Sequence, residues 1–348
     1  MSTEFGLTYR EIEADGFRID EKVEIFLGSD TSVGIAKSMG LALAGFAEVY
    51  ERLKPDIIVG MGDRFELFSA VTAACVSRIP IAHLSGGEIT EGAIDDAFRH
   101  AITKMSHLHF TSTEGYRRRV IQLGEDPQRV FNVGEIGLDN LKEVKFLPKK
   151  KLEDDLSIKF KKHNLLVTFH PVTLEKGASQ NQFQQLLEVL DDLNDTQIIF
   201  TKANADMEGR RINRMIDEFV SQRTQKATAV ASLGHQRYVS LVKLADAVVG
   251  NSSSGIVEAP SLSTPTINIG DRQKGRIKAR SVVDCLPTRD SIKKAFKKVY
   301  SKEFRQQLKN VQNPLGDGQS AERVKRILKE QDLKDILKKK FYGWEPLK

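Results

Sequence analysis

Two segments of the sequence concentrate acidic side chains in a way that suits proton transfer. Asp63 and Arg64 directly follow the apolar run 57–59, and residues 83–96 hold three glycines and four carboxylates, the latter within nine residues. Two carboxylates in a partly dry cleft can serve as a general base and a general acid. An aspartate at such a position can also simply cap a helix, and the residues alone leave that alternative open.

Residues 250–260 have the composition of a phosphate-binding loop. They read Gly-Asn-Ser-Ser-Ser-Gly-Ile-Val-Glu-Ala-Pro and continue an apolar run. The hydroxyls of Ser252 and Ser253, together with N–H groups at a helix start, could hold a diphosphate. Glu258 could accept hydrogen bonds from ribose hydroxyls, or could be only a capping carboxylate. The segment lacks the signatures of a Walker loop and of a hydrolase nucleophile elbow.

Further polar residues follow apolar runs in the second half of the chain. They are His170 after the run 165–169, Asn204 and Asp206 after 197–202, and Arg272 in the basic segment 270–276. A cation near a phosphate-binding loop would complement the phosphates, and a histidine at a strand end could contact a phosphate or a sugar. The basic segment 270–276 could instead be only an exposed charged turn.

The elements that must position these residues alternate between short apolar runs and amphipathic segments, which predicts a doubly wound α/β fold with parallel sheets. We expect strands at 23–28, 56–62, 81–85, 107–112, 130–134, 165–169, 197–202, 227–231, 247–250 and 265–269. Helices are expected at 34–53, 64–77, 94–105, 114–123, 181–193, 210–220, 236–244 and 252–262, with mostly helix after 290. Ligands of such folds bind outside the carboxyl ends of the strands, where the polar segments lie.

The length of 348 residues predicts two domains. We place an N-terminal Rossmann-like domain at 1–145, a polar linker at 146–164 and a C-terminal nucleotide-binding Rossmann-like domain at 165–315. The helices at 316–348 are expected to pack back on the N-terminal domain. Two such domains would face each other across a cleft.

The composition excludes several classes of protein. The net charge of +6 is mild, and the lysine runs carry no interleaved aromatic residues, so a nucleic-acid-binding protein is not expected. No run of eighteen apolar residues and no secretory signal are present, and the two cysteines lie far apart. We therefore predict a cytoplasmic protein without a membrane span, a disulfide framework or a metal site.

Taken in order, five blocks of the sequence resemble the UDP-N-acetylglucosamine 2-epimerase family, in particular its hydrolysing branch that serves sialic-type nonulosonic acid synthesis. The blocks are GDRFE, HLSGGEITEGAIDDAFRHAITK, FHPVT, GNSSSGIVEAPS and INIGDRQKGR. The resemblance spans essentially the whole chain and implies the GT-B-like arrangement of two Rossmann-like domains. It also implies a homodimer or homotetramer, with a UDP-sugar as the substrate and no metal or redox cofactor.

The resemblance assigns roles to individual residues. It implies catalytic carboxylates at Asp63, Glu88 and Asp95, and substrate contacts at Arg64, His83, His170, Asn204, Ser252, Ser253, Glu258 and Arg272. In the family's reaction a base removes the C2 proton of the N-acetylglucosamine unit while UDP leaves C1. Water then adds to the resulting glycal and releases N-acetylmannosamine, so the implied activity is that of a hydrolysing UDP-N-acetylglucosamine 2-epimerase.

The sequence departs from the family at two places. Many members have a catalytic glutamate where this chain has Ser85, so either Glu88 or another group takes that role, or the substrate differs. The chain also begins after the family's first βα unit, roughly 40 residues at the usual size of such a unit. From this we expect the 348-residue chain to be poorly stable or weakly active, with a longer reading frame upstream.

Four alternatives to the leading activity follow from the same residues. The same reaction could act on a UDP-2,4-diacetamido-2,4,6-trideoxyhexose of the legionaminic acid route, or the enzyme could be a non-hydrolysing 2-epimerase. A UDP-sugar glycosyltransferase shares the architecture, although it does not explain the carboxylate-rich loop. A catalytically inactive protein that only binds a nucleotide sugar is the fourth alternative.

Overall fold

The computed structural model describes residues 9–25, 27, 31–91, 93–172, 177–203 and 208–343. The chain forms two units, which we call the N-lobe and the C-lobe. The N-lobe comprises Ile19–Thr90, Ile94–Lys142 and Leu315–Lys348, and the C-lobe comprises Met1–Arg18, Glu91–Ala93 and Glu143–Pro314. Each lobe is therefore assembled from segments that lie far apart in the sequence, and each holds one parallel sheet.

The N-lobe sheet contains four parallel strands in the order β1-β2-β3-β4. These are β1 (Ile58–Met61), β2 (Ile81–Leu84), β3 (Leu108–Thr111) and β4 (Val130–Asn132). The helices that follow in the lobe are α3 (Phe65–Val76), α4 (Asp95–Met105) and α5 (Glu114–Gln122), preceded by α2 (Ser32–Leu53). Threonines cap two of them: Thr31 accepts a hydrogen bond from the Gly34 N–H, and Thr113 accepts one from the Tyr116 N–H. The strands and helices predicted from 34 to 134 are thus confirmed.

The strand predicted at 23–28 is wrong for the residues described there. Residues 19–25 and 27 have no regular secondary structure. Val23 instead packs against α2, where a Cβ on Gly45 would lie 2.5 Å from the Val23 Cγ1 atom. Val23 joins the hydrophobic core formed by α2 and α3. An alternating pattern favours a strand only where a neighbouring strand can pair with it, and β1 has its single described partner in β2.

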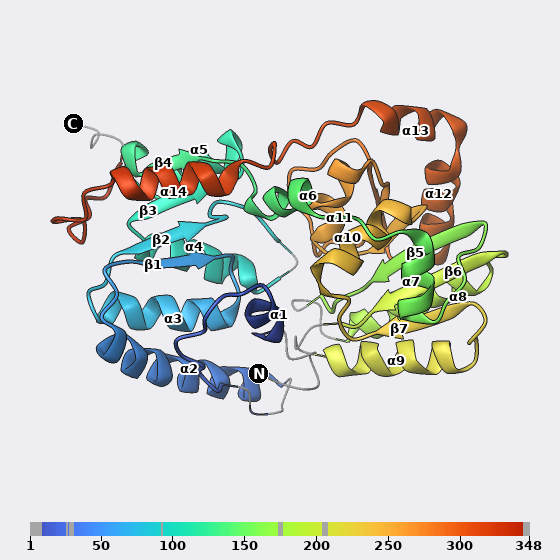
Figure 1. Ribbon diagram of the computed structural model, residues 1–348, viewed down its shortest axis with the longest axis horizontal. Helices are drawn as coiled ribbons and strands as arrows, with labels where there is room; N and C mark the ends of the chain where they lie inside the picture. The colour runs from blue at the N-terminus through green and yellow to red at the C-terminus, as the bar shows by residue number, and fades with distance from the viewer. Residues whose placement is uncertain are drawn as a thin grey trace. The chain divides into compact units, whose positions relative to one another are not determined.

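The C-terminal segment completes the N-lobe core. Val324 of α14 (Ser320–Glu330) and Ile336 are buried in one cluster with Leu84 and Phe110 of the sheet. Figure 1 shows α14 lying along β3 and β4. Farther along, Lys339 donates to the Glu125 carboxylate at 2.7 Å, and the Tyr342 N–H donates to the Gly124 carbonyl.

One helix departs from the expectation that no segment could cross a membrane. Helix α2 is long and apolar enough for that by length and composition alone, and 22% of its most apolar 18-residue window is buried. The same helix packs on α3, with Ala42, Val49 and Tyr50 buried on its inner face. That contact is the packing of an amphipathic helix on a neighbouring helix of a globular lobe.

The C-lobe sheet contains six parallel strands in the order β10-β9-β8-β5-β6-β7. They are β5 (His163–Thr168), β6 (Thr196–Thr201), β7 (Ala227–Val230), β8 (Ala247–Gly250), β9 (Thr266–Ile269) and β10 (Val282–Cys285). The five strands predicted from 165 to 269 are confirmed, and β10 was not predicted. The chain builds the sheet outward from β5 to β7 and then outward from β8 to β10 on the other side. The boundary between β5 and β8 is therefore the topological switch point, where such folds bind ligands.

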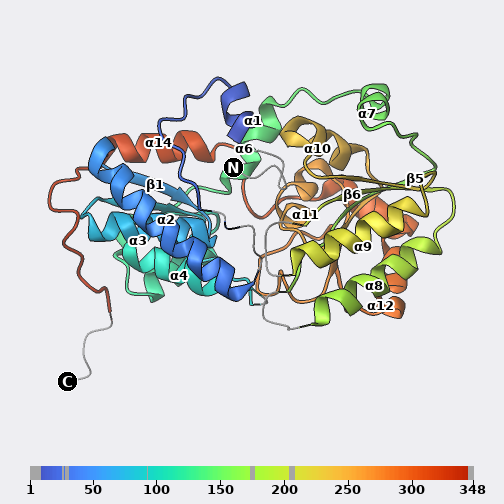
Figure 2. The same cartoon turned by 90° about the horizontal axis from the view of Figure 1, so that it is seen from below.

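Helices cover both faces of this sheet. Residues of α8 (Ala178–Asp191), α9 (Gly209–Ser221) and α12 (Arg289–Tyr300) pack into the larger core cluster, and Figure 2 shows these three helices together. On the other face, α7 (Lys149–Leu156) and α10 (Gly234–Leu244) contribute to a smaller cluster. Both faces of β5 and β8 are buried, which explains why each strand contains an unbroken apolar run, 165–167 and 247–249, rather than an alternating pattern.

The helix predicted at 252–262 is interrupted. It consists of α11 (Ser254–Val257), only four residues long, followed by a 3₁₀ turn at Ala259–Leu262. Pro260 lacks the N–H that a continuing α-helix would need, so the helical hydrogen bonds end there. The element after the serine-rich loop is therefore much shorter than the sequence pattern indicated.

Candidate functional site

A cavity of about 450 Å³ opens in the C-lobe at the carboxyl ends of β5, β6, β7 and β8. It is lined by Thr168, His170, Thr201, Lys202, Ala231, Ser232, Leu233, Gly234, His235, Tyr238, Ser252, Ser253, Ser254 and Arg272. The structure thus brings together four residues singled out from the sequence: His170, Ser252, Ser253 and Arg272. The volume of the cavity is in the range of small-molecule sites, and the cavity is lined by many hydroxyl groups and by cationic side chains.

The loop 251–254 follows β8, and we call it the serine loop. It begins after Gly250, a glycine that no other residue can replace without strain. Gly250 has φ +130°, and a Cβ there would overlap the Thr168 carbonyl oxygen of the neighbouring strand. This close approach lets the Asn251 N–H donate to the Thr168 oxygen at 3.1 Å. The loop therefore starts at a fixed point next to β5, directly beside the switch point.

Hydroxyl groups of the loop form a chain. The Ser252 and Ser254 Oγ atoms lie 3.2 Å apart, and the Tyr238 hydroxyl of α10 hydrogen-bonds with Ser254 Oγ. Arg272 donates through Nη1 to the Asn251 carbonyl at 3.2 Å, which places its guanidinium at the same loop. Because α11 has only four residues, its dipole is weaker than the sequence pattern indicated, and the hydroxyls and Arg272 are the groups suited to an anion.

Glu258 is the C-cap residue that follows α11 and is not among the residues that line the cavity. Burial raises the pKa of its carboxyl to about 7, although the Glu258 backbone and Arg276 favour the charged form. Its Oε2 atom is inaccessible to solvent and has no hydrogen-bond partner in the part of the chain that the structure describes. Burial, with the nearby Glu258 charge, also raises the pKa of the Tyr238 hydroxyl. A carboxyl in such surroundings readily takes up a proton near neutral pH.

In the N-lobe, Asp63 follows β1 and forms an ion pair with Arg99 of α4. Arg99 is 1% exposed, and its Nη1 also donates to Thr90 Oγ1 at 3.2 Å. Asp96 lies 3.7 Å from the same guanidinium and accepts from the Thr90 N–H at 2.6 Å. One buried cation thus joins the loop after β1, the loop after β2 and the start of α4.

Sequence reasoning missed Arg99, although its spacing from two aspartates offered a signal. Positions three and four apart on a helix lie on the same face, so Asp95 and Asp96 share a face with Arg99. Tyr238, Lys202 and His235, which line the C-lobe cavity, were also missed. They come from a strand end and a helix whose sequences carry no recognisable motif.

His83 of β2 is fully buried, and both of its ring nitrogens are used inside the N-lobe. Nε2 lies 2.9 Å from the Gly62 carbonyl and Nδ1 lies 3.1 Å from Thr103 Oγ1. Burial lowers the pKa of His83 to about 3, so the ring is neutral at physiological pH. The residue fixes the backbone next to Asp63, and its role as a substrate contact stays a prediction.

The other predicted residues of the N-lobe lie near the same strand ends. Glu88 is 5% exposed and accepts from Ser112 Oγ at 3.1 Å, whereas Asp95, in the first turn of α4, is half-buried. Arg64 is half-buried, and its Nε lies 3.5 Å from the Glu66 carboxylate. Ser85, which stands where the family resemblance expects glutamate, has φ +64°, a left-handed conformation uncommon for residues other than glycine.

Asn204 and Asp206 lie outside the described residues, so the structure does not place them. Among the residues that are described, no group of three or more His, Cys, Asp or Glu side chains is arranged to hold a metal ion.

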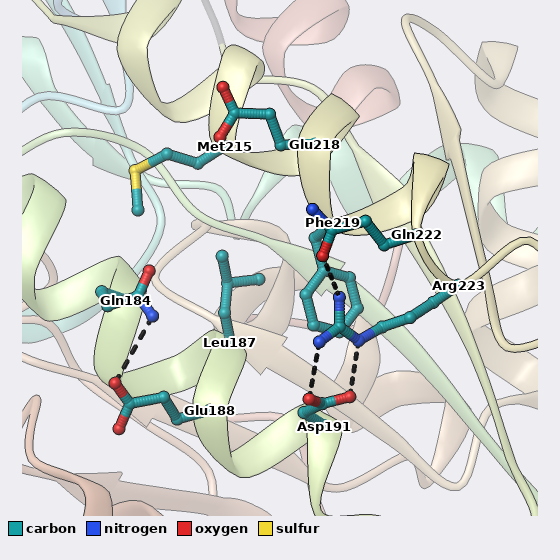
Figure 3. A pocket seen from close by; sticks show the side chains of 9 residues that line it. All are labelled: Gln184, Leu187, Glu188, Asp191, Met215, Glu218, Phe219, Gln222 and Arg223. Atoms are coloured by element: carbon teal, nitrogen blue, oxygen red, sulfur yellow. Dashed lines mark hydrogen bonds and ion pairs between the residues drawn. The ribbon is translucent and has the colours of Figure 1, made fainter.

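A smaller hollow between α8 and α9, of about 190 Å³, contains none of the predicted residues. Figure 3 shows that Arg223 makes paired hydrogen bonds with Asp191, at 2.5 and 2.6 Å, over the ring of Phe219. Gln184 likewise donates to Glu188. Since these groups already satisfy one another, the C-lobe cavity at the switch point is the stronger candidate site.

Comparisons with known proteins identify the family and the fold. The sequence profile of the family described as UDP-N-acetylglucosamine 2-epimerase matches residues 1–329. A hydrolysing GDP/UDP-N,N'-diacetylbacillosamine 2-epimerase of Campylobacter jejuni is 46% identical over 342 residues, covering 98% of this chain and 88% of that protein. A hydrolysing UDP-N,N'-diacetylbacillosamine 2-epimerase of Legionella pneumophila is 34% identical over 325 residues, covering 93% and 84%.

The crystal structure of UDP-GlcNAc 2-epimerase from Neisseria meningitidis bound to UDP-GlcNAc is also similar. It has a TM-score of 0.77 at 19% identity, with 92% of this chain and 88% of that chain covered. At this identity the likeness concerns the fold, and it confirms the predicted GT-B-like α/β architecture with two parallel sheets.

Proposed function

This chain belongs to the UDP-N-acetylglucosamine 2-epimerase family, and on that premise we propose that it is a hydrolysing 2-epimerase of a UDP-linked 2-acetamido sugar. The observation that carries the proposal is the cavity at the β5–β8 switch point, where serine hydroxyls, His170 and Arg272 converge. Hydroxyl and guanidinium donors suit a diphosphate, which is both the handle of such a substrate and its leaving group.

The proposed reaction gives each group of residues a task. A base removes the proton from C2 of the sugar while the C1–O bond breaks and UDP leaves with the bonding electrons, which forms a 2-acetamidoglycal. Water then adds its hydroxyl to C1 and a proton returns to C2 from the opposite face. Asp63, Glu88 and Asp95 are the proposed acids and bases. Ser252, Ser253 and Arg272 would stabilise the departing diphosphate, with His170 beside it.

For the substrate we propose UDP-N,N'-diacetylbacillosamine, which is a UDP-2,4-diacetamido-2,4,6-trideoxyhexose. The relatives that are 46% and 34% identical to this chain carry that sugar in their names. Ser85 in place of glutamate is a further difference from the family pattern in the N-lobe. UDP-N-acetylglucosamine, the first expectation from the sequence, is the second candidate because the family profile bears its name.

Product analysis tests the proposal. The protein is incubated with each UDP-sugar in heavy water, and mass spectrometry follows UDP, the free sugar and deuterium at C2. We expect UDP and a free, C2-deuterated sugar, with a higher kcat/KM for the diacetamido substrate. A UDP-linked epimer would instead indicate the non-hydrolysing reaction, and no turnover of either substrate would refute the proposal.

A pair of aspartates that flank the two ends of β1 tests the catalytic role. Asp63 follows the carboxyl end of β1, whereas the exposed Asp56 precedes its amino end. We expect Asp63→Asn to lower kcat by at least about a hundredfold, since general acid–base groups commonly contribute that much. Asp56→Asn should keep normal turnover. Equal activity of the two variants would remove Asp63 from the mechanism.

We further propose that the enzyme works in the cytoplasm as a homodimer or homotetramer. Cys75 and Cys285 are both unpaired, which suits a reducing compartment. Analytical ultracentrifugation of the purified chain measures the assembly, and a purely monomeric protein at micromolar concentration would contradict the oligomeric part of the proposal.

A further inference from the structure

We propose that Asn251 is a positioning residue: it locks the His170 loop, the serine loop and Arg272 together in the arrangement that binds the nucleotide diphosphate. The inference rests on the proposed function, because it concerns how that ligand is held. Asn251 does not line the cavity itself, so it would act only through its neighbours.

The side chain of Asn251 pairs with the backbone of His170 in both directions. Its Nδ2 donates to the His170 carbonyl at 2.8 Å, and its Oδ1 accepts from the His170 N–H at 2.7 Å. Asn251 is 1% exposed, so water cannot replace these hydrogen bonds. The loop after β5 is thereby attached to the loop after β8 by two short, buried contacts.

The backbone of the same residue binds a third loop. The Asn251 carbonyl accepts from Arg272 Nη1 at 3.2 Å and from Gln273 Nε2 at 2.9 Å, and both donors follow β9. One residue therefore contacts the carboxyl-end loops of β5, β8 and β9. These are the loops that bring His170, the serine hydroxyls and Arg272 to the cavity.

The chemistry of this arrangement requires an amide. The backbone of His170 offers one donor and one acceptor side by side, and only a planar group with both an oxygen and an NH₂ can match them. A smaller side chain would leave a buried N–H and a buried carbonyl without partners, and the loop would have to move to satisfy them. A displaced loop carries His170 away from the cavity.

Two other asparagines in the C-lobe make the same pairing at other places. Asn164, at the amino end of β5, donates to and accepts from the Lys161 backbone at 2.9 Å each. Asn213 of α9 does the same with Ala203, at 3.3 and 2.7 Å. Asn164 is 7% exposed and lies at the opposite end of the strand that leads to His170, so it is a matched control.

The test compares Asn251→Ala with Asn164→Ala. Alanine is preferable to aspartate, because a new carboxylate beside the diphosphate would repel it directly. Isothermal titration calorimetry gives the Kd for UDP, and steady-state kinetics gives kcat and KM. We expect N251A to raise the Kd at least tenfold and N164A to change it less than twofold, although both variants lower the melting temperature.

Asn251→Ser covers the case in which N251A does not fold. A serine hydroxyl ends one bond short of the amide but keeps a polar group facing the His170 backbone, so N251S should bind UDP with an affinity between those of the wild type and N251A. Wild-type affinity in N251A, or in N251S when only that variant folds, would overturn the inference. Equal losses in the Asn251 and Asn164 variants would overturn it as well, because the effect would then be general destabilisation.

A double-mutant cycle checks that Asn251 acts through its neighbours. If Asn251 acts by holding His170 and Arg272, N251A should raise the Kd for UDP by a smaller factor in an H170A or R272A background than in the wild type. Fully additive losses in both backgrounds would refute the positioning role. Absence of UDP binding by the wild-type protein would refute the proposed function itself, which distinguishes that failure from failure of the inference.

Discussion

The buried carboxyl of Glu258 should make the stability of the C-lobe depend on pH in a direction opposite to that of most carboxylates. Its pKa is raised from 4.5 to about 7 by burial. Between these two values the folded chain holds a proton that the unfolded chain has lost. The free energy of unfolding must therefore fall as the pH rises through this window.

The size of the effect follows from the same two values. The gap corresponds to about 3 kcal/mol as an upper figure, at about 1.4 kcal/mol for each tenfold change in proton affinity. The contribution of the protonated carboxyl is fully present below pH 4.5 and is lost above about pH 7. Glu258→Gln keeps the shape of the neutral, protonated carboxyl and cannot ionise. The stability of the variant should therefore not fall over this pH window.

Thermal unfolding of both proteins at pH 5, 6, 7 and 8 measures the difference. We expect E258Q and the wild type to melt close together at pH 5, and E258Q to melt higher at pH 8. For a lobe of this size the difference should reach at most roughly 6–12 °C, at 2–4 °C per kcal/mol. Glu303→Gln, at an exposed position of the same lobe, is the control and should leave the pH profile unchanged. A gap between E258Q and wild type that stays constant from pH 5 to 8 would refute the reasoning.

Three further predictions concern single positions. Glu125 accepts from Lys104, His109 and Lys339 inside the N-lobe, and its pKa is lowered to about 2 because these hydrogen bonds outweigh its burial. Glu125→Gln should lower the free energy of unfolding by about 3–5 kcal/mol. The wild type should lose this stabilisation as the pH falls from 4.5 towards 2. An unchanged urea midpoint of the variant at pH 7 would contradict the role of the cluster. Gly250→Ala should prevent stable folding of the C-lobe, since its Cβ would overlap Thr168. By contrast, Gly40→Ala, which meets nothing within 4 Å on α2, should raise the stability by up to about 1 kcal/mol; circular dichroism melts measure both.

The regular elements could be predicted because burial leaves a periodic trace in the sequence. Strands β5 and β8 are buried on both faces, and their continuous apolar runs are visible without a structure. Strand β10 was missed because Asp284 interrupts its run after two valines. The segment around Val23 has a strand-like pattern, but that pattern reflects packing against α2.

The candidate site could be predicted only in part, for a related reason. Ser252 and Arg272 were found because they stand in loops after strands, which is a feature of the sequence. Arg99 and Asn251 act through partners that lie 36 and 81 positions away in the chain. Those pairings depend on which strands are neighbours in the sheet, and no local pattern records that order.

The return of the chain's last segment to the N-lobe has a consequence for synthesis on the ribosome. Arg129 donates to the Ile336 carbonyl across 207 positions, and Val324 and Ile336 fill the core beneath strands made some 200 residues earlier. All six strands of the C-lobe are translated before those side chains leave the exit tunnel. We therefore expect the second sheet to form first and the nascent N-lobe to expose apolar surface until translation ends, when chaperones could bind it. A stop codon before position 320 would then prevent the N-lobe from folding. Asp63, Glu88 and Asp95 would no longer be held in place, although none of them is mutated.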